Sequence, residues 1–106
     1  MYRIIYITTG NEQEAELIAN TLVEKKLVAC ANIFPIKSVY WWEGKIETAT
    51  EQLVIIKTRR ALFVVVRDRI LQLHPYKVPE ILAVPVEAGS EEYLRWLKES
   101  TSPPRD

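Results

Sequence analysis

Hydrophobic and polar positions along the chain change period at a few clear breaks, and each break separates two predicted elements. Residues 2–8 are β-branched and aromatic on both faces, which predicts an interior strand. After this strand, Asn11 is a helix-capping residue and Glu14 follows three positions later, as in a capping box. One helical face is then marked by Ala15, Ile18, Ala19 and Leu22. The chain therefore begins with a strand and a helix.

Two long strands are predicted next, joined by a tight turn. Residues 28–42 and 45–58 are rich in residues that favour strands, and Glu43-Gly44 between them supplies the turn. Pro35 interrupts the first arm, because proline has no N–H for a ladder hydrogen bond. We therefore expect a bulge, a bend or an edge position at Pro35. Both arms exceed the usual strand length of about 5–6 residues.

Residues 61–74 fit either a strand or a helix. The run Val64-Val65-Val66 has high strand propensity. One helical stripe is nevertheless formed by Phe63, Val66, Ile70 and Leu73. We expect a helix that ends at His74-Pro75, because a residue before proline disfavours the helical conformation. The apolar Val64-Val65-Val66 run has no explanation in the sequence other than extra burial.

The remaining residues predict one more strand and a last helix. Residues 80–87 are typical of a strand, and Pro85 indicates an edge position or an irregular pairing. Ser90 is placed to cap the last helix, which has acidic residues in its first turn. We expect the tail from Ser100 to Asp106 to be frayed.

The order β-α-β-β-α-β plus a terminal helix predicts an α+β fold of the ferredoxin-like class. In this sandwich, two helices cover one face of an antiparallel sheet, and here the central hairpin is long. A chain of 106 residues is the size of one domain, so we expect a single domain over residues 1–106.

The charge balance and the cysteine count exclude some classes of binding partner and indicate a compartment. The chain has 14 basic and 14 acidic residues, so it lacks the basic excess that nucleic acid or an anionic membrane surface requires. Its apolar runs are shorter than a membrane span. A single cysteine rules out an intramolecular disulfide, which is typical of a reducing compartment. We therefore expect a cytoplasmic protein that binds neither nucleic acid nor a membrane.

Cys30 and His74 are the soft metal-ligand side chains of this sequence. Thiolate and imidazole suit copper or zinc. A closed zinc site needs about four ligands, so one chain would need carboxylates or symmetric copies to complete it. The alternative is structural: Cys30 as a small strand residue, and His74 bonded to carbonyls at the end of its helix.

Three consecutive aromatic residues, Tyr40, Trp41 and Trp42, lie on the first hairpin arm. Successive strand residues point to opposite sides, so Trp41 and Trp42 do not share one core. Large exposed aromatic side chains mark contact surfaces. We favour a subunit interface over the alternatives of a core role or a ligand platform.

Other sequence patterns give weaker indications of a binding or catalytic site. Residues 8–11 precede a helix N-terminus, where anions bind, but a simple helix cap explains them better. Three acidic residues at even offsets would share one strand face: Glu43, Glu47 and Glu51. They could bind a hard cation, but we prefer a face that is solvated or ion-paired. One histidine and the absence of a glycine-rich nucleotide motif leave catalysis without support.

Five segments together resemble the CutA family of divalent-cation tolerance proteins. They are residues 27–33 (LVACANI), 40–47 (YWWEGKIE), 56–58 (IKT), 74–81 (HPYKVPEI) and 93–97 (YLRWL). The resemblance covers essentially the whole chain. It implies a ferredoxin-like protomer in a homotrimer shaped like the PII signalling proteins, with hairpin strands that pair with neighbouring subunits. It also implies a role in metal-ion tolerance, copper being the ion most often proposed, and no established catalytic activity.

The chain departs from the family pattern at some of the proposed copper ligands. Ile7 stands where a first-strand cysteine is found, and Leu73 precedes His74 where histidines are paired. Lys77 replaces a residue that is often acidic or polar in the family.

Three hypotheses follow. The first is a non-enzymatic homotrimer linked to metal-ion tolerance, whose long edge strands find partners on sister chains. The second is a PII-like sensor that holds a small molecule in clefts between subunits, although Glu43-Gly44 is too short to be a long ligand loop. The third, an unrecognised enzyme, has no support in the sequence beyond such clefts.

Overall fold

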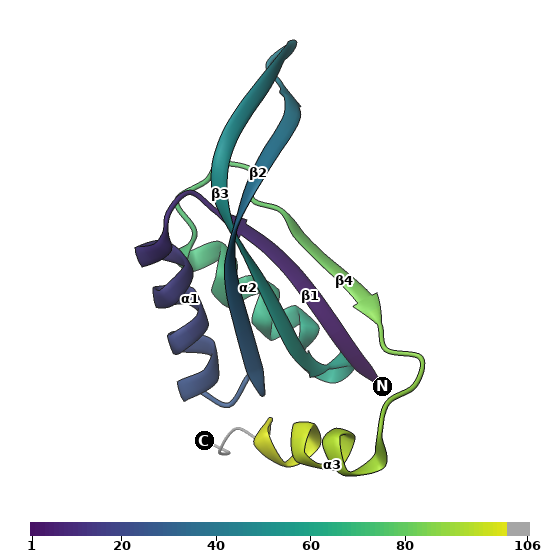
Figure 1. Ribbon diagram of the computed structural model, residues 1–106. Coiled ribbons are helices and arrows are strands. Elements are labelled where there is room, and N and C mark those ends of the chain that lie inside the picture. The colour runs from purple at the N-terminus through teal and green to yellow at the C-terminus, as the bar shows by residue number, and fades with distance from the viewer. Residues whose placement is uncertain (102–106) are drawn as a thin grey trace.

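A four-stranded antiparallel sheet in the order β2-β3-β1-β4 is the centre of the computed structural model, which describes residues 1–101 (Figure 1). The strands are β1 (Tyr2–Thr9), β2 (Cys30–Trp42), β3 (Lys45–Arg59) and β4 (Ile81–Pro85). The helices are α1 (Glu12–Glu24), the 3₁₀ turn η1 (Arg60–Leu62), α2 (Phe63–Leu73) and α3 (Glu91–Ser100). The predicted ferredoxin-like α+β fold is confirmed.

The core lies between the sheet and the helices α1 and α2. β1 is flanked by β3 and β4, so the predicted interior position is confirmed. Its side chains Ile5 and Ile7 are fully buried. They pack in one cluster with residues of α1, β3 and α2: Ala15, Ile18, Ala19, Leu22, Val54, Ile56, Val66 and Ile70. The predicted core face of α1 is therefore confirmed residue by residue.

The N-terminus of α1 has the predicted capping box. The Glu14 amide donates to Asn11 Oδ1 at 2.9 Å, and Glu14 Oε2 accepts from the Gly10 amide at 3.3 Å. The first contact satisfies an amide that the first turn of a helix leaves without a partner, and the second ties the residue before the cap to the helix. The cap interpretation of residues 8–11 is therefore confirmed.

The β2–β3 hairpin is long and regular. Its pairing runs from Cys30↔Lys57 to Trp42↔Lys45 without a skipped residue. The bulge that Pro35 made us consider is therefore wrong. Pro35 is tolerated because β2 is an edge strand, where a missing N–H costs the sheet no ladder hydrogen bond. Glu43 (φ 49°) and Gly44 (φ 78°) form the two-residue turn with positive φ at both positions, as tight hairpins require.

The second half of the chain differs from the sequence prediction in detail. The ambiguous segment is helical, so the strand alternative is wrong. Within Val64-Val65-Val66, Val66 joins the core, whereas Val64 and Val65 are 53% and 49% exposed. Extra burial therefore explains one valine of the run and not the other two. β4 is shorter than predicted, and Pro85 ends it at the edge of the sheet.

α3 packs at the end of the sheet remote from the hairpin tip (Figure 1). Arg59 of β3 binds Thr101 through its side chain, with Arg59 Nε donating to Thr101 Oγ1 at 2.9 Å. Ser100 ends the helix and Thr101 is fully buried, so the chain is ordered beyond the point where we expected fraying. The rest of that predicted tail, residues 102–106, lies outside the described residues.

The hairpin projects well beyond the other elements (Figure 1). The molecule measures 44 × 31 × 20 Å and its radius of gyration is 14.4 Å. A compact domain of this length has a radius of gyration of about 13 Å. The projecting hairpin explains why the radius of gyration is larger than this value. Within residues 1–101, no helix has the length and apolar character needed to cross a bilayer.

Candidate functional site

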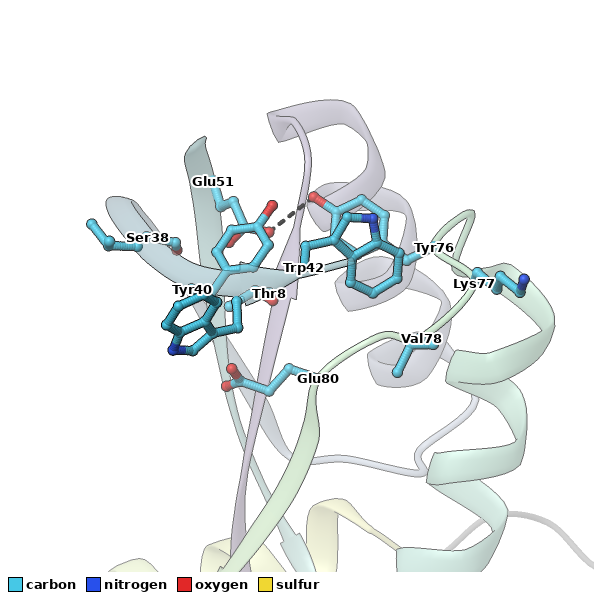
Figure 2. Close-up of a pocket in the computed structure, with 11 residues that line it drawn as sticks. Thr8, Ser38, Tyr40, Trp42, Glu51, Tyr76, Lys77, Val78 and Glu80 are labelled. Carbon is cyan, nitrogen blue, oxygen red and sulfur yellow. Dashed lines mark hydrogen bonds between the residues drawn. The ribbon is translucent and has the colours of Figure 1, made fainter. Parts of the chain in front are cut away.

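A cavity of about 710 Å³ lies where the hairpin meets the loop between α2 and β4 (Figure 2). Four aromatic residues border it: Tyr40, Trp41, Trp42 and Tyr76. Two carboxylates, those of Glu51 and Glu80, also line it. Its volume is that of a small-molecule site. We call it the hairpin pocket.

The hairpin register brings the strand residues of the pocket to one face. Residues two apart on a strand share a face, so Ser38, Tyr40 and Trp42 lie together on β2. Glu51 of β3 pairs with Ile36, which is in the same series, so its side chain points to that face too. Strand alternation therefore gathers these four side chains on one side of the hairpin, whereas Val39 and Trp41, which also border the pocket, alternate to the other side.

Glu51 is the buried carboxylate of the pocket. Only 6% of the residue is exposed, and the Tyr76 hydroxyl donates to its Oε2 at 2.9 Å (Figure 2). Burial, followed by the hydrogen bond and the charge of Glu51, raises the pKa of Tyr76. The phenol therefore stays neutral and acts as a donor. Gly10 passes close to this hydroxyl, since a Cβ at Gly10 would lie 3.1 Å from it.

Glu80 lies across the pocket from Glu51 and is more exposed. Loss of solvent, followed by the negative charge of Glu51, raises the pKa of Glu80. Within residues 1–101, neither carboxylate forms an ion pair. The ammonium of Lys77, on the same loop, points away from both of them (Figure 2). The pocket thus has two acidic groups and no cation placed to neutralise them.

His74 positions the loop that carries Tyr76. It is 8% exposed, its Nε2 lies 2.7 Å from the Thr8 carbonyl oxygen, and the Tyr76 amide donates to its Nδ1 at 3.1 Å. A neutral ring with the proton on Nε2 satisfies both contacts. His74 therefore links the loop to β1. We expected its ring to bond to carbonyls in the last turn of its own helix, but it bonds to the Thr8 carbonyl of β1 instead.

Cys30 and His74 are not brought together within one chain. Cys30 pairs with Lys57, which pairs with Ile4, whereas His74 bonds to Thr8, four residues further along β1. That separation is about 13 Å along the strand. The Cys30 sulfur lies 4.0 Å from Lys57 Nζ.

The described residues assemble no group of three or more His, Cys, Asp or Glu side chains fit for a metal ion. Both ring nitrogens of His74 are already engaged within the chain. Metal binding by Cys30 and His74 stays a prediction, and one chain does not build it from this pair.

The three hairpin aromatics are all outside the core. Trp41 is 73% exposed, and Tyr40 and Trp42 are each 41% exposed. The core alternative is therefore wrong. The ligand-platform alternative matches their place in the pocket wall, and the interface stays a prediction.

The three carboxylates expected on one solvated face have different surroundings. Glu43 is in the turn, Glu47 is exposed on β3, and Glu51 is buried. The preferred interpretation is therefore wrong for Glu51. Sequence reasoning also missed Tyr76 and Glu80 as pocket residues, although both belong to the segment 74–81 that carries the family resemblance.

The fold and the pocket define a ferredoxin-like α+β domain with an extended hairpin and a cavity large enough for a small ligand. A family model described as CutA1 divalent ion tolerance protein matches residues 3–100. The chain belongs to this CutA1 family.

Relatives within this family are similar over most of the chain. The divalent-cation tolerance protein CutA of Archaeoglobus fulgidus is 54% identical over 100 residues, which cover 94% of this chain and 98% of that protein. The chloroplastic protein CutA of Arabidopsis thaliana is 46% identical over 99 residues, and the match spans 92% of this chain and about half (54%) of the plant protein.

A solved structure shows the same fold. The structure described as the periplasmic divalent cation tolerance protein CutA from Archaeoglobus fulgidus aligns with a TM-score of 0.94 at 53% sequence identity. The alignment covers 96% of this chain and all of that one.

Proposed function

We propose that this chain forms a homotrimer that takes part in tolerance of divalent metal ions and has no catalytic role. The metal-ion part rests on family membership and on what its relatives are named for. The observation that carries the assembly is the outer edge of β2, which has no strand partner within residues 1–101.

An edge strand of this length favours association. β2 has 13 residues, and its outer edge presents a row of backbone groups without ladder partners. Such an edge pairs readily with another chain, and proteins normally shorten, charge or cover it. Closed three-fold pairing satisfies every copy of the edge in the same way.

The sheet face opposite α1 and α2 supports the same proposal. Ile4 and Tyr6 alternate with the buried core residues of β1 and therefore point to this face, as do their β4 partners Val84 and Leu82. Leu82 is 58% exposed and Val84 is 38% exposed. A contiguous apolar surface of this kind is typical of a contact between proteins. Tyr40 and Trp42 share this face by strand alternation and would extend that contact onto the hairpin, and Trp41 would contact a neighbouring subunit from the other face of the arm.

Sedimentation velocity tests the assembly. We expect a trimer at micromolar concentration, held together mainly by the hairpin. A monomer at that concentration would leave β2 unpaired in solution and would refute the proposal.

Direct copper binding is a more specific version of the proposed role in metal-ion tolerance. In an assembly, Cys30 and His74 of symmetric copies supply more soft ligands than one chain does. Titration of the purified protein with Cu(II) and Zn(II), in wild type, Cys30→Ala and His74→Ala, measures each contribution. Unchanged stoichiometry and affinity in both variants would remove these residues from the metal site.

A small-molecule sensor is the second candidate, and the size of the hairpin pocket favours it. The charge of the pocket argues against the anionic ligands of PII proteins, because two carboxylates line it. We expect no heat from ATP or 2-oxoglutarate in calorimetry. Saturable heat from either would favour the sensor.

The cytoplasm remains the compartment we expect from the single cysteine. Relatives carry the words periplasmic and chloroplastic in their names, and these describe those proteins. Fractionation of the native host, followed by immunoblotting, tests the prediction.

A further inference from the structure

We propose that the outward face of α2 is a docking surface for an acidic amphipathic helix of another protein. α2 packs on the helix side of the sheet and contributes no residue to the hairpin pocket. A trimer formed through β2 and the opposite sheet face would therefore leave this surface uncovered. The proposal also accounts for the Val64-Val65-Val66 run, of which the core uses only Val66.

Helical spacing places three exposed residues in one stripe on α2. Val64, Arg67 and Leu71 stand at i, i+3 and i+7, turned away from the buried Val66 and Ile70. Val64 is 53% exposed and Leu71 is 51% exposed. Side chains of a second helix repeat at the same period, so they can pack between these positions.

The exposed valines are unfavourable for the chain on its own. A β-branched side chain loses rotamer freedom in a helix, so valine has a lower helix propensity than lysine or glutamate. Val64 and Val65 are both about half exposed and gain little burial in return. Residues that oppose local structure in this way are typical of functional positions.

The charge around the stripe indicates an acidic partner. η1 and α2 together contain three arginines and one acidic residue, in a chain whose net charge is zero. Within residues 1–101, the guanidinium groups of Arg60 and Arg69 form no ion pair. The first turn of α2 has no acidic residue and no side-chain cap, so the positive end of the helix dipole adds to the charge of Arg60. Carboxylates on a partner helix would be attracted to this surface.

Asp68 is the acidic residue of this face. Its Oδ1 accepts from Arg67 Nη2 at 3.0 Å, and the side chains of Arg67 and Asp68 are 43% and 56% exposed. An exposed ion pair of this kind is weak, because water screens it. The Arg67 guanidinium has five N–H donors in all, so it can bind a partner carboxylate as well as Asp68 or in its place.

Two other occupants fit this face less well. An anionic membrane favours bulky apolar side chains on the inserted face, whereas this one offers two valines, one leucine and the negative charge of Asp68. A second copy of this chain would use α1, which has glutamates and no basic residue. A contact between α1 of one copy and α2 of the next joins two different surfaces, so it would string trimers into open assemblies.

Fluorescence anisotropy with a labelled model peptide tests the proposal on the purified full chain. The peptide has about three heptads, with leucine at positions a and d and glutamate at e and g, and a hydrocarbon staple holds it helical. We expect saturable binding that weakens as salt is added, because salt screens exposed charges. The same stapled peptide with lysine in place of glutamate should not bind. Sedimentation of the same samples gives the oligomeric state, so a failed trimer and an inactive α2 face are distinguishable.

Matched variants locate the surface. Arg67→Glu should weaken peptide binding at least about tenfold. Arg95→Glu makes the same charge change on α3, where Arg95 also pairs with an acidic neighbour, and should leave the affinity unchanged. Leu71→Ser should weaken binding about fivefold. Leu17→Ser, at a leucine that is 54% exposed on α1, should have no effect.

Three results would overturn the proposal. The first is no saturable binding of the acidic peptide to a protein whose circular dichroism is native. The second is an equal loss of affinity in Arg67→Glu and Arg95→Glu, which would mean nonspecific attraction between charges. The third is a different occupant: association of trimers, or binding to phosphatidylserine vesicles, that Arg67→Glu abolishes while the peptide does not bind.

Discussion

At the scale of single residues, a chain of hydrogen bonds connects β1 to the hairpin through the loop after α2. The Thr8 carbonyl and the Tyr76 amide both bond to the ring of His74, and the Tyr76 hydroxyl bonds to Glu51. Each contact fixes the next, so the loop, the central strand and the hairpin base are held in one arrangement. The pocket depends on this arrangement, because Tyr76 forms part of its wall.

Tyr76→Phe should lower the stability of the fold. The variant removes the donor to a carboxylate that is 6% exposed and leaves that charge without its hydrogen bond. We expect a loss of about 1–3 kcal/mol in the free energy of unfolding, measured by urea denaturation at fixed protein concentration.

The matched control is Tyr93→Phe, because the Tyr93 hydroxyl has no hydrogen bond within residues 1–101. Its effect should be within about 0.5 kcal/mol of zero. Equal losses in the two variants would mean that the Glu51 contact adds no stability.

Glu80→Gln should raise stability at neutral pH and leave it unchanged in acid. The pKa of Glu80 is raised above its ordinary value of 4.5 by loss of solvent and by Glu51. A carboxyl with a raised pKa in the folded state penalises folding once it is ionised in both states, and the penalty vanishes below the ordinary value. The gain at pH 7 is below about 1 kcal/mol, because the side chain is exposed.

Thermal unfolding of wild type and Glu80→Gln between pH 3.5 and pH 8 measures this difference. Glu47→Gln provides the comparison for a general loss of negative charge. A Glu80 variant whose advantage grows as the pH falls would have the opposite sign and would contradict the assigned direction.

At the scale of elements, most of the fold could be predicted because local pattern and tertiary structure agree. Period-2 and helical spacing identified β1, α1, the hairpin and α2, and the structure shifts their ends by one or two residues. The role of Pro35 was harder to predict, because a proline in a strand is typical of both a bulge and an edge position. The place of β2 at the edge of the sheet decides between these two alternatives. Glu51 was missed for a related reason: its hydrogen-bond partner Tyr76 is 25 residues away in the chain.

Gly44→Ala should destabilise the hairpin turn. Gly44 has φ 78°, a conformation that costs a residue with a Cβ about 1–2 kcal/mol. An added Cβ meets no atom within 4 Å, so the expected cost is conformational and not a steric clash. Gly44→Asn should cost less, because asparagine tolerates positive φ. Thermal unfolding of the two variants measures the difference, and an alanine variant as stable as wild type would contradict this reasoning.

At the scale of the whole molecule, one chain leaves large apolar side chains uncovered. The hairpin projects from the body, the face opposite the helices is apolar, and Trp41 on the hairpin is 73% exposed. The sequence predicted the long arms and placed three consecutive aromatic residues on one of them. It did not predict the pocket, because a cavity arises from the relative placement of strand, loop and hairpin and has no local pattern.

Trp41→Ala should lower the melting midpoint sharply if the hairpin is a subunit contact. In an isolated chain, truncating a side chain that is 73% exposed changes stability by about 0.5 kcal/mol or less. At the centre of an interface, loss of a tryptophan costs about 2 kcal/mol or more. Leu17→Ala, at an exposed position on α1, is the control and should have little effect. A midpoint that is unchanged in Trp41→Ala would count against the hairpin contact.

The central position of β1 also has a consequence for biosynthesis. β1 precedes both of its hydrogen-bonded neighbours, since its partners begin at Gln52 in β3 and at Ile81 in β4. Ribosomes add about 5–20 residues per second, so this apolar strand emerges roughly seconds before its first partner. During that interval the nascent strand is exposed to aggregation or to capture by a chaperone, with α1 as its one early cover. The four-stranded sheet is complete only after β4, which ends at Pro85, has left the exit tunnel.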